Sequence, residues 1–310
     1  MNILRKKKMI YCVVAVVILL VVVLGVCVSS ALTNNEPFGE AVQLGQEDLR
    51  KGNYESAIYH LKRAAKISPE ESRYTVLINL GMAYFKAGEL SSAANVFERA
   101  VLINHTEQAL EALAVVRYKQ GLYEEAMKAY TQATTEYGRT SNLLAGLAAC
   151  HISQGNTKYA QDILLEALNR DPNNQVVLYN IASLKYDCNE FVDAANYFVR
   201  FFEVVDVDEN KEQLERAREH FSALIAKYPA NLKKDANACY SQAVNYYRQN
   251  NLPAAFKETV KASRLDPTEP TFTALLISIS KKVNRPENIQ RLTKRIKNGF
   301  PEYAEKLNIK

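Results

Sequence analysis

The stretch LINLGMAYFKAGELSSAANVFERA, residues 77–100, decides how this chain folds. Its apolar residues recur every three or four positions on both sides of Gly88, which is the spacing of two amphipathic helices. Glycine readily adopts the left-handed backbone conformation that a tight turn between helices needs. The stretch therefore predicts two antiparallel helices joined at Gly88.

The same pattern occurs seven times along the chain. Its turn position is always glycine or asparagine: Gly52, Gly88, Gly121, Gly155, Asn189, Asn250 and Asn284. These turns are 36, 33, 34, 34, 61 and 34 residues apart. In the first six copies an alanine stands five residues after the turn, and in most copies a second alanine follows seven residues later. Small side chains on one helical face let a neighbouring helix come close, so the chain is predicted to repeat one helical hairpin.

The pattern resembles the tetratricopeptide repeat, whose period is about 34 residues. The residues that match its signature position by position are Leu77, Leu80, Gly81, Tyr84, Ala93, Phe97 and Ala100. The resemblance implies an all-α fold, a right-handed superhelix (α-solenoid), with units 1–5 in residues 38–206 and units 6–7 with a C-terminal cap in residues 233–304. The last units depart from the pattern, because Thr259 replaces a bulky residue and Ile289 and Ile296 replace the alanines.

The spacing of 61 between Asn189 and Asn250 leaves room for one extra helix in residues 207–232. Ala217, Phe221 and Leu224 have the spacing of a second helix of the repeat, without a first helix before them. We therefore expect a lone helix near residues 208–228 that interrupts the regular stacking. This helix has two alternative roles: it only covers the end of the fifth unit, or it has a function of its own.

The N-terminus carries a predicted membrane segment. Residues 1–8 form a basic flank, residues 9–28 are twenty residues without a charge, and residues 29–37 form a linker. A helix of that length spans the hydrocarbon core of a bilayer. Basic residues before it favour a cytoplasmic N-terminus, with the repeats on the non-cytoplasmic side. This signal-anchor interpretation has an alternative, a cleaved signal peptide, because small residues follow at positions 29–31.

The net charge does not indicate a nucleic-acid partner. The chain has 39 basic and 34 acidic residues, a formal charge of +5. Four of the basic residues lie in the flank before the membrane segment, so residues 9–310 carry a balance of only +1. A basic stripe that neutralises phosphates is therefore not predicted.

By the same resemblance, the first helix of each pair forms a concave wall that binds partners, and positions three residues before each turn face inward. In this chain those positions are rich in aromatic residues, as is a second set seven residues further back. The predicted groove residues are Leu49, Phe85, Tyr118, Ile152, Tyr186 and Tyr247, with Tyr179 and Tyr240 from the second set, and Arg50, Lys86, Lys119 and Arg248 beside them. The apolar members suit an extended peptide or a partner helix, and the cations suit acidic groups. The alternative is that the aromatic residues pack between neighbouring first helices.

Catalysis and cofactor binding have no sequence signature here. The four histidines are isolated, no two cysteines have metal-ligand spacing, and no glycine-rich phosphate loop is present. Cys150, Cys188 and Cys239 are expected to be small apolar residues on helices. We therefore expect no metal, no cofactor, no small-molecule substrate and no enzymatic activity, although a catalytic cluster assembled across repeats is not excluded by sequence.

The sequence thus favours a membrane-anchored scaffold that mediates protein–protein interactions in an envelope or membrane-associated complex. By resemblance, such anchored solenoids are commonest among bacterial envelope accessories, which suggests a periplasmic location for the repeats. The alternative is a chaperone-like receptor that holds extended apolar peptides or exported proteins. A scaffold should bind one folded partner, whereas a holding protein should bind many apolar peptides.

Overall fold

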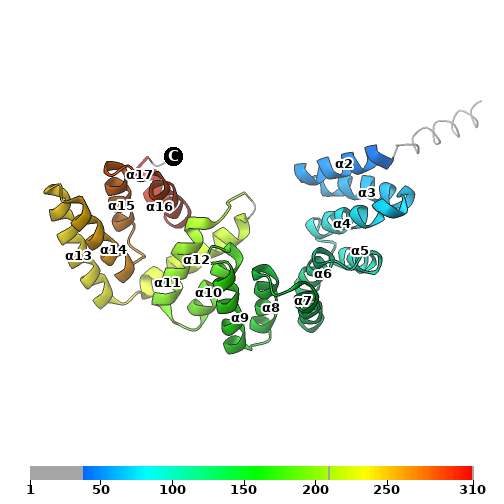
Figure 1. The fold of residues 1–310 in the computed structure, drawn as a ribbon, viewed down its shortest axis with the longest axis horizontal. Helices are drawn as coiled ribbons and strands as arrows, with labels where there is room; N and C mark the ends of the chain where they lie inside the picture. Colours follow the sequence, from blue (N-terminus) through cyan, green and yellow to red (C-terminus); the bar gives the residue numbers. More distant parts are fainter. Residues whose placement is uncertain (1–37, 209, 309–310) are drawn as a thin grey trace, which may run out of the picture. The chain divides into compact units, whose positions relative to one another are not determined.

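The computed structural model describes residues 38–208 and 210–308, which form sixteen α-helices and no strand (Figure 1). The helices are α2 (Phe38–Lys51), α3 (Tyr54–Ile67), α4 (Glu70–Lys86), α5 (Leu90–Ile103), α6 (Glu107–Lys119), α7 (Tyr123–Tyr137), α8 (Ser141–Ser153), α9 (Thr157–Arg170), α10 (Gln175–Asp187), α11 (Phe191–Val204), α12 (Lys211–Lys227), α13 (Ala230–Arg248), α14 (Leu252–Leu265), α15 (Pro270–Lys282), α16 (Pro286–Gly299) and α17 (Pro301–Lys306). The predicted all-α repeat architecture is confirmed.

The predicted membrane segment, residues 9–28, lies outside the described residues, as do the flank and the linker beside it. Among helices α2 to α17, none combines the length and the apolar character that crossing a bilayer requires. The described chain divides into two compact units, with the boundary between Ala109 and Leu110 inside α6. Unit 1 contains α2 to α5 and the first three residues of α6, and unit 2 contains the rest of α6 and α7 to α17.

The turns between paired helices have the predicted left-handed conformation. The glycines at these turns have φ values of 79° to 81°, and Asn189, Asn250 and Asn284 have φ values of 61°, 59° and 52°. At the turn after α4, the Gly88 N–H donates to the Phe85 carbonyl at 3.1 Å and the Glu89 N–H donates to the Tyr84 carbonyl at 2.9 Å. These two bonds satisfy carbonyls that the end of a helix otherwise leaves without a partner.

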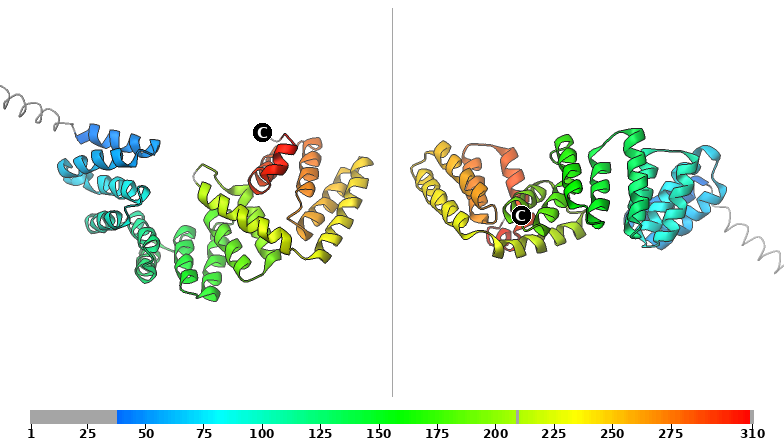
Figure 2. Two further views of the ribbon diagram at one scale, coloured as in Figure 1. Left: turned by 180° about the vertical axis from the view of Figure 1, so that it is seen from behind. Right: turned by 90° about the horizontal axis from the view of Figure 1, so that it is seen from below.

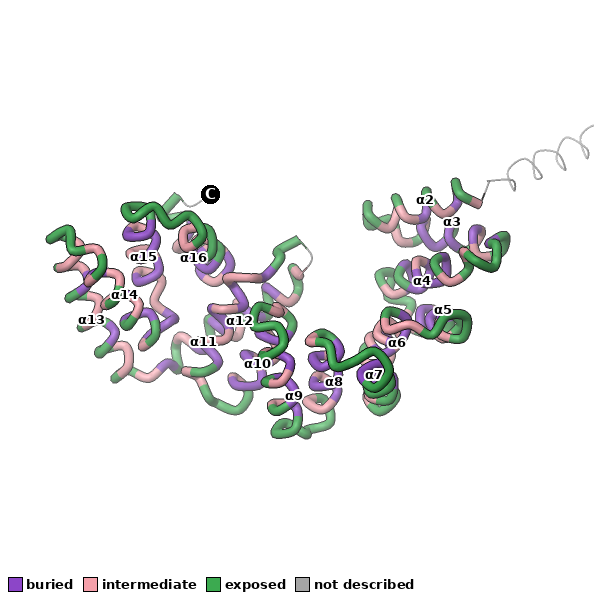
Figure 3. Tube along the Cα trace, viewed as in Figure 1, coloured by how far each residue is buried: buried purple, intermediate pink, exposed green. Residues whose placement is uncertain are grey.

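Inside the first two hairpins, a glycine of the first helix receives a large side chain of the second. A Cβ atom built on Gly81 in α4 would lie 2.5 Å from Cε1 of Phe97 in α5. In the preceding hairpin, a Cβ on Gly45 would lie 2.6 Å from Cγ of Leu61. The equivalent positions of four later first helices hold fully buried alanines, Ala114, Ala148, Ala182 and Ala243. Buried residues accordingly recur along the helices, and most of the turns between them are exposed (Figure 3).

The C-terminal hairpins of unit 2 fold back onto α11. Helix α16 packs on α11, α15 packs on α16, and α14 and then α13 follow outward (Figures 1 and 2). The Asn298 side-chain amide donates to the Phe202 carbonyl at 2.9 Å, and Arg291 pairs with Glu203 at 2.8 Å. A Cβ on Gly299 would lie 2.6 Å from Cδ2 of Phe202, so the two helices approach closely here as well.

An ion pair joins the loop before α8 to α9. The Arg139 Nε and Nη2 atoms donate to the two carboxylate oxygens of Glu166 at 2.8 and 2.6 Å. The hydrogen bonds from Arg139, and then those from Arg170, lower the pKa of the Glu166 carboxyl to about 2. Because this pKa lies below its usual value of 4.5, the pair stabilises the fold at neutral pH, and the stabilisation is lost as the pH falls from that value towards 2.

The hairpin packing predicts that Gly81→Ala destabilises unit 1, because the new methyl group collides with the ring of Phe97, which is 1% exposed. Overpacking of this kind costs about 1–3 kcal/mol in the free energy of unfolding. Chemical denaturation followed by circular dichroism measures the change, and adding Phe97→Leu to Gly81→Ala should restore part of the loss.

Gly39→Ala is the matched control for this substitution. Gly39 also lies in a helix of unit 1, but a Cβ at this position has no atom within 4 Å. It should leave stability unchanged or raise it by up to about 1 kcal/mol, since alanine is the better helix former. Equal destabilisation by Gly81→Ala and Gly39→Ala would contradict the close-approach argument.

The ion pair predicts that Arg139→Ala raises the pKa of Glu166, with Arg170 remaining as a weaker partner. Titration of the Glu166 carboxyl carbon by NMR should move from a midpoint near 2 towards 4.5. The accompanying loss of stability at neutral pH should stay below about 1 kcal/mol, because both side chains are partly accessible to solvent, which screens the pair. An unchanged midpoint would show that the ion pair between Arg139 and Glu166 does not form in solution.

Candidate functional site

The predicted groove residues all lie at partly or fully accessible positions of first helices. The eight apolar and aromatic members are half-buried, and Arg50, Lys86, Lys119 and Arg248 are exposed. Leu49, Arg50, Phe85 and Lys86 belong to unit 1, and the others belong to unit 2. The two sets are therefore described separately, and members of the unit 2 set line a pocket.

This pocket, which we name the Gly146 pocket, has a volume of about 350 Å³. Five helices of unit 2 contribute to it, namely α6, α7, α8, α10 and α12. Its lining residues are Tyr118, Lys119, Tyr130, Ala145, Gly146, Ala149, Val176, Tyr179, Asn180, Glu212, Gln213 and Arg216. Of the twelve predicted groove residues, Tyr118, Lys119 and Tyr179 thus line one common pocket.

The α8 side of the pocket is made of small residues. Ala145, Gly146 and Ala149 contribute at most a methyl group each to its surface. Gly146 is required for a second reason, because a Cβ at this position would collide with Cζ of Tyr130. The Tyr130 ring therefore lies directly against the α8 backbone, and burial raises the pKa of its hydroxyl. Neither Tyr130 nor Gly146 is among the groove residues that the sequence predicts.

The aromatic side chains Tyr118 and Tyr179 come from the helices on either side of α8. The Tyr118 ring lies 5.4 Å from the ring of Tyr123, and its hydroxyl accepts a hydrogen bond from Ser153 Oγ at 3.1 Å. The Tyr179 ring packs on Phe201 with 5.7 Å between centroids. These contacts fix both rings in place while leaving them half-buried, which is the state of a preformed binding surface.

Helix α12 lies in the segment where the sequence predicts an extra helix, and it packs on α10 and α11 (Figure 1). Its residues Leu214, Ala217, Phe221 and Leu224 are buried in the core formed with α10 and α11. Burying one Leu or Phe side chain contributes about 1.5–3 kcal/mol to the free energy of folding. Detaching α12 would expose several such side chains and lose each of these contributions. Helix α12 is therefore a fixed wall of the pocket and not a removable lid.

Tyr186, another predicted groove residue, is covered by α12. The His220 ring stacks on the Tyr186 ring with 5.0 Å between centroids and an interplanar angle of 8°. The Lys227 ammonium lies 5.2 Å from the same ring centroid. The aromatic surface that continues along α10 is thus already occupied by the protein's own helix. The spacing of the turns predicts the inserted helix α12, but it does not predict that α12 covers Tyr186.

The remaining predicted groove residues of unit 2 do not join the pocket. Tyr240 packs against Phe272 with 4.9 Å between ring centroids, and Lys282 Nζ lies 4.1 Å from the Tyr247 ring centroid. Both tyrosines therefore contact α15, as the packing alternative predicts. Ile152 is half-buried at the end of α8 and does not line the pocket.

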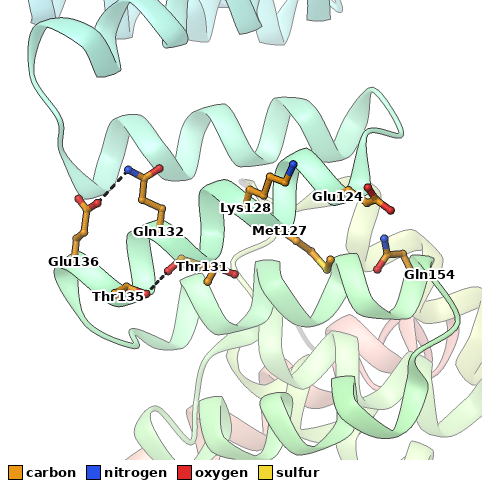
Figure 4. Close-up of a pocket in the computed structure, with 8 residues that line it drawn as sticks. All are labelled: Glu124, Met127, Lys128, Thr131, Gln132, Thr135, Glu136 and Gln154. Carbon is orange, nitrogen blue, oxygen red and sulfur yellow. Dashed lines mark hydrogen bonds between the residues drawn. The ribbon is translucent and has the colours of Figure 1, made fainter.

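A larger depression of about 620 Å³ lies along α7 and includes none of the predicted groove residues (Figure 4). Its side chains are mostly polar, and Gln132 donates to Glu136 at 3.1 Å within it. Met127 is the apolar exception. The depression lacks the aromatic side chains and small-residue surface that make the Gly146 pocket suited to an apolar group.

No group of three or more His, Cys, Asp or Glu side chains in residues 38–208 and 210–308 has the arrangement of a metal site. What the described residues do form is a series of hairpins with glycine or asparagine turns and small-to-large packing between paired helices. This fold, with an accessible pocket on its first helices, defines the chain as an α-helical repeat protein of the tetratricopeptide type. A tetratricopeptide repeat model matches residues 206–270.

The family model described as the coatomer epsilon subunit matches residues 45–228, more than half of the chain. The chain belongs to this family. The match includes α3 to α11 and ends just after α12. It therefore takes in all the elements that line the Gly146 pocket.

Two curated relatives are similar over part of their length. The chain is 32% identical over 88 residues to human protein O-mannosyl-transferase TMTC1, covering 28% of this chain and 10% of that protein. It is 23% identical over 210 residues to TPR repeat-containing protein MJ1428 of Methanocaldococcus jannaschii, covering 67% of this chain and 34% of that protein. The chain thus spans well under two thirds of the length of either relative.

Solved structures of helical proteins are similar in part. The pilF protein of Pseudomonas aeruginosa is 18% identical with a TM-score of 0.47, covering 90% of this chain and 100% of that chain. MamA of Desulfovibrio magneticus RS-1 is 18% identical with a TM-score of 0.46, covering 54% of this chain and 94% of that chain.

Proposed function

We propose that this protein is a membrane-anchored scaffold that binds a protein partner on the first helices of unit 2, at the Gly146 pocket. The observation that carries the proposal is the pocket itself, where two fixed tyrosine rings flank the small residues of α8. Half-buried tyrosines around a preformed depression are typical of the residues that contribute most to protein–protein binding. The family supports a role within an assembly, because its name is that of a coatomer subunit.

A scaffold agrees better with the pocket than a receptor for extended apolar peptides does. A holding protein needs a long continuous apolar surface, whereas here α12 covers Tyr186 and ends the accessible aromatic surface beside α10. Tyr240 and Tyr247 are also engaged with α15. The aromatic surface left open in unit 2 is short, which favours one defined partner.

The proposal includes the predicted topology. Residues 9–28 would anchor the chain, with the N-terminus in the cytoplasm and the repeats on the non-cytoplasmic side, by the length and charge rules for membrane helices. In a bacterial envelope that compartment is the periplasm. The superhelix of the repeats is right-handed in this proposal, as the resemblance implies.

Photocrosslinking tests where the partner binds. A photoreactive amino acid at Tyr179 in the full chain, in its native membrane, should give one dominant adduct with a partner protein. The matched control is the same residue at Asn169, which is exposed on the second helix α9. Adducts that form equally at both positions, or only at Asn169, would place the partner elsewhere.

Topology has a separate test that uses the native cysteines. Cys188 is exposed and Cys150 is buried. A membrane-impermeant maleimide added to intact cells should label Cys188, and Cys188→Ser should remove most of the signal. Labelling that requires permeabilised cells would place the repeats in the cytoplasm and contradict the proposed compartment.

A further inference from the structure

The Gly146 pocket has the dimensions of an anchor site for one side chain. Its volume of about 350 Å³ lies at the low end of the range for ligand pockets. The pocket is bounded on the α12 side by Gln213 and Arg216, which belong to a helix held by its buried stripe. A partner segment therefore cannot continue along α10 past this point without displacing α12. Only a short part of the partner can contact the pocket.

The lining selects for an apolar group. Tyr118, Tyr179, Val176 and the three small residues of α8 are half of its twelve lining residues. The Tyr130 ring fills the space beside Gly146, so this part of the wall is aromatic as well. A large apolar or aromatic side chain that fills such a space is the typical anchor of a protein interface.

The charges at the pocket select for a carboxylate next to that anchor. Arg216 already pairs with Glu212 at 2.6 Å. Lys119 is exposed at the end of α6, and no ion pair is shown for it among the described residues. The pocket therefore offers an uncompensated ammonium group beside its apolar surface, and an acidic partner group would complement it.

We propose that the Gly146 pocket binds a partner protein segment in which one large apolar side chain is flanked by acidic residues. The apolar side chain enters between Tyr118 and Tyr179, and a neighbouring carboxylate pairs with Lys119. Helix α12 is the fixed wall that limits the site to one anchor. This inference rests on the proposed function, and it specifies the chemistry of the partner that the scaffold binds.

Three capped Gly-Ser peptides test the proposal, carrying Glu-Phe-Glu, Lys-Phe-Lys or Glu-Ala-Glu at their centres. Binding to the full chain in detergent is read by saturation-transfer NMR from the peptides' own signals. We expect Glu-Phe-Glu to bind through its ring. Lys-Phe-Lys should bind at least about tenfold more weakly because it lacks the carboxylates, and Glu-Ala-Glu should not bind because it lacks the large apolar side chain. Equal binding of Glu-Phe-Glu and Lys-Phe-Lys would refute the charge assignment.

Two substitutions locate the binding. Ala149→Phe should fill the pocket and abolish Glu-Phe-Glu binding. Lys119→Glu, at an exposed position that should not affect folding, should reverse the preference in favour of Lys-Phe-Lys. The matched controls are Ala238→Phe and Lys234→Glu on α13, both at exposed positions outside the pocket, and they should change nothing. Unchanged preference in Lys119→Glu overturns the proposal even if Ala149→Phe fails to fold.

The remaining outcomes separate this inference from the proposed function. A partner adduct at Tyr179 without any peptide binding would leave the scaffold function standing and refute the anchor chemistry. Peptide binding without an adduct at Tyr179 would support the chemistry and contradict the scaffold site. Octanoate also combines an apolar chain with a carboxylate, and binding of octanoate in place of Glu-Phe-Glu would overturn the assignment of a protein partner.

Discussion

The close approach of paired helices is the constraint on which the rest of this structure depends. At Gly81 in α4 there is no room for even one methyl group beside Phe97. The same contact, with glycine or alanine on the first helix, returns at the equivalent position of later hairpins. Because the small residue fixes how deeply the partner side chain enters, it also fixes which face of the first helix stays accessible.

In unit 2, part of that accessible face lines the Gly146 pocket, and helix α12 covers the part that follows. The face of α6, α8 and α10 carries Tyr118, the small residues of α8 and Tyr179, and α12 then packs over Tyr186. Helix α16 in turn packs on α11. It is also bonded to α12, where Arg218 Nε donates to the Asn298 carbonyl at 2.7 Å. The inserted helix α12 thus bounds the Gly146 pocket on one side.

Much of this architecture follows from local sequence. Turn residues such as Gly88 and Asn250 and the alanines at fixed distances from them specify the hairpins, because each depends on contacts within about one repeat. The return of α16 to α11 could not be predicted this way. It depends on Gly299 meeting Phe202, nearly a hundred residues earlier, and neither residue has a repeat-specific signature. The pocket combines five helices, and the grouping of Tyr118 with Arg216 is likewise visible only in three dimensions.

A partner that binds on the first helices of unit 2 should leave α12 in place. Hydrogen exchange of the full chain, with and without its crosslinked partner, measures this. We expect added protection in α8 and α10 on binding and unchanged protection in α12, which is already buried in the core. Added protection confined to the second helices α7 and α9, or exposure of α12 on binding, would contradict this expectation.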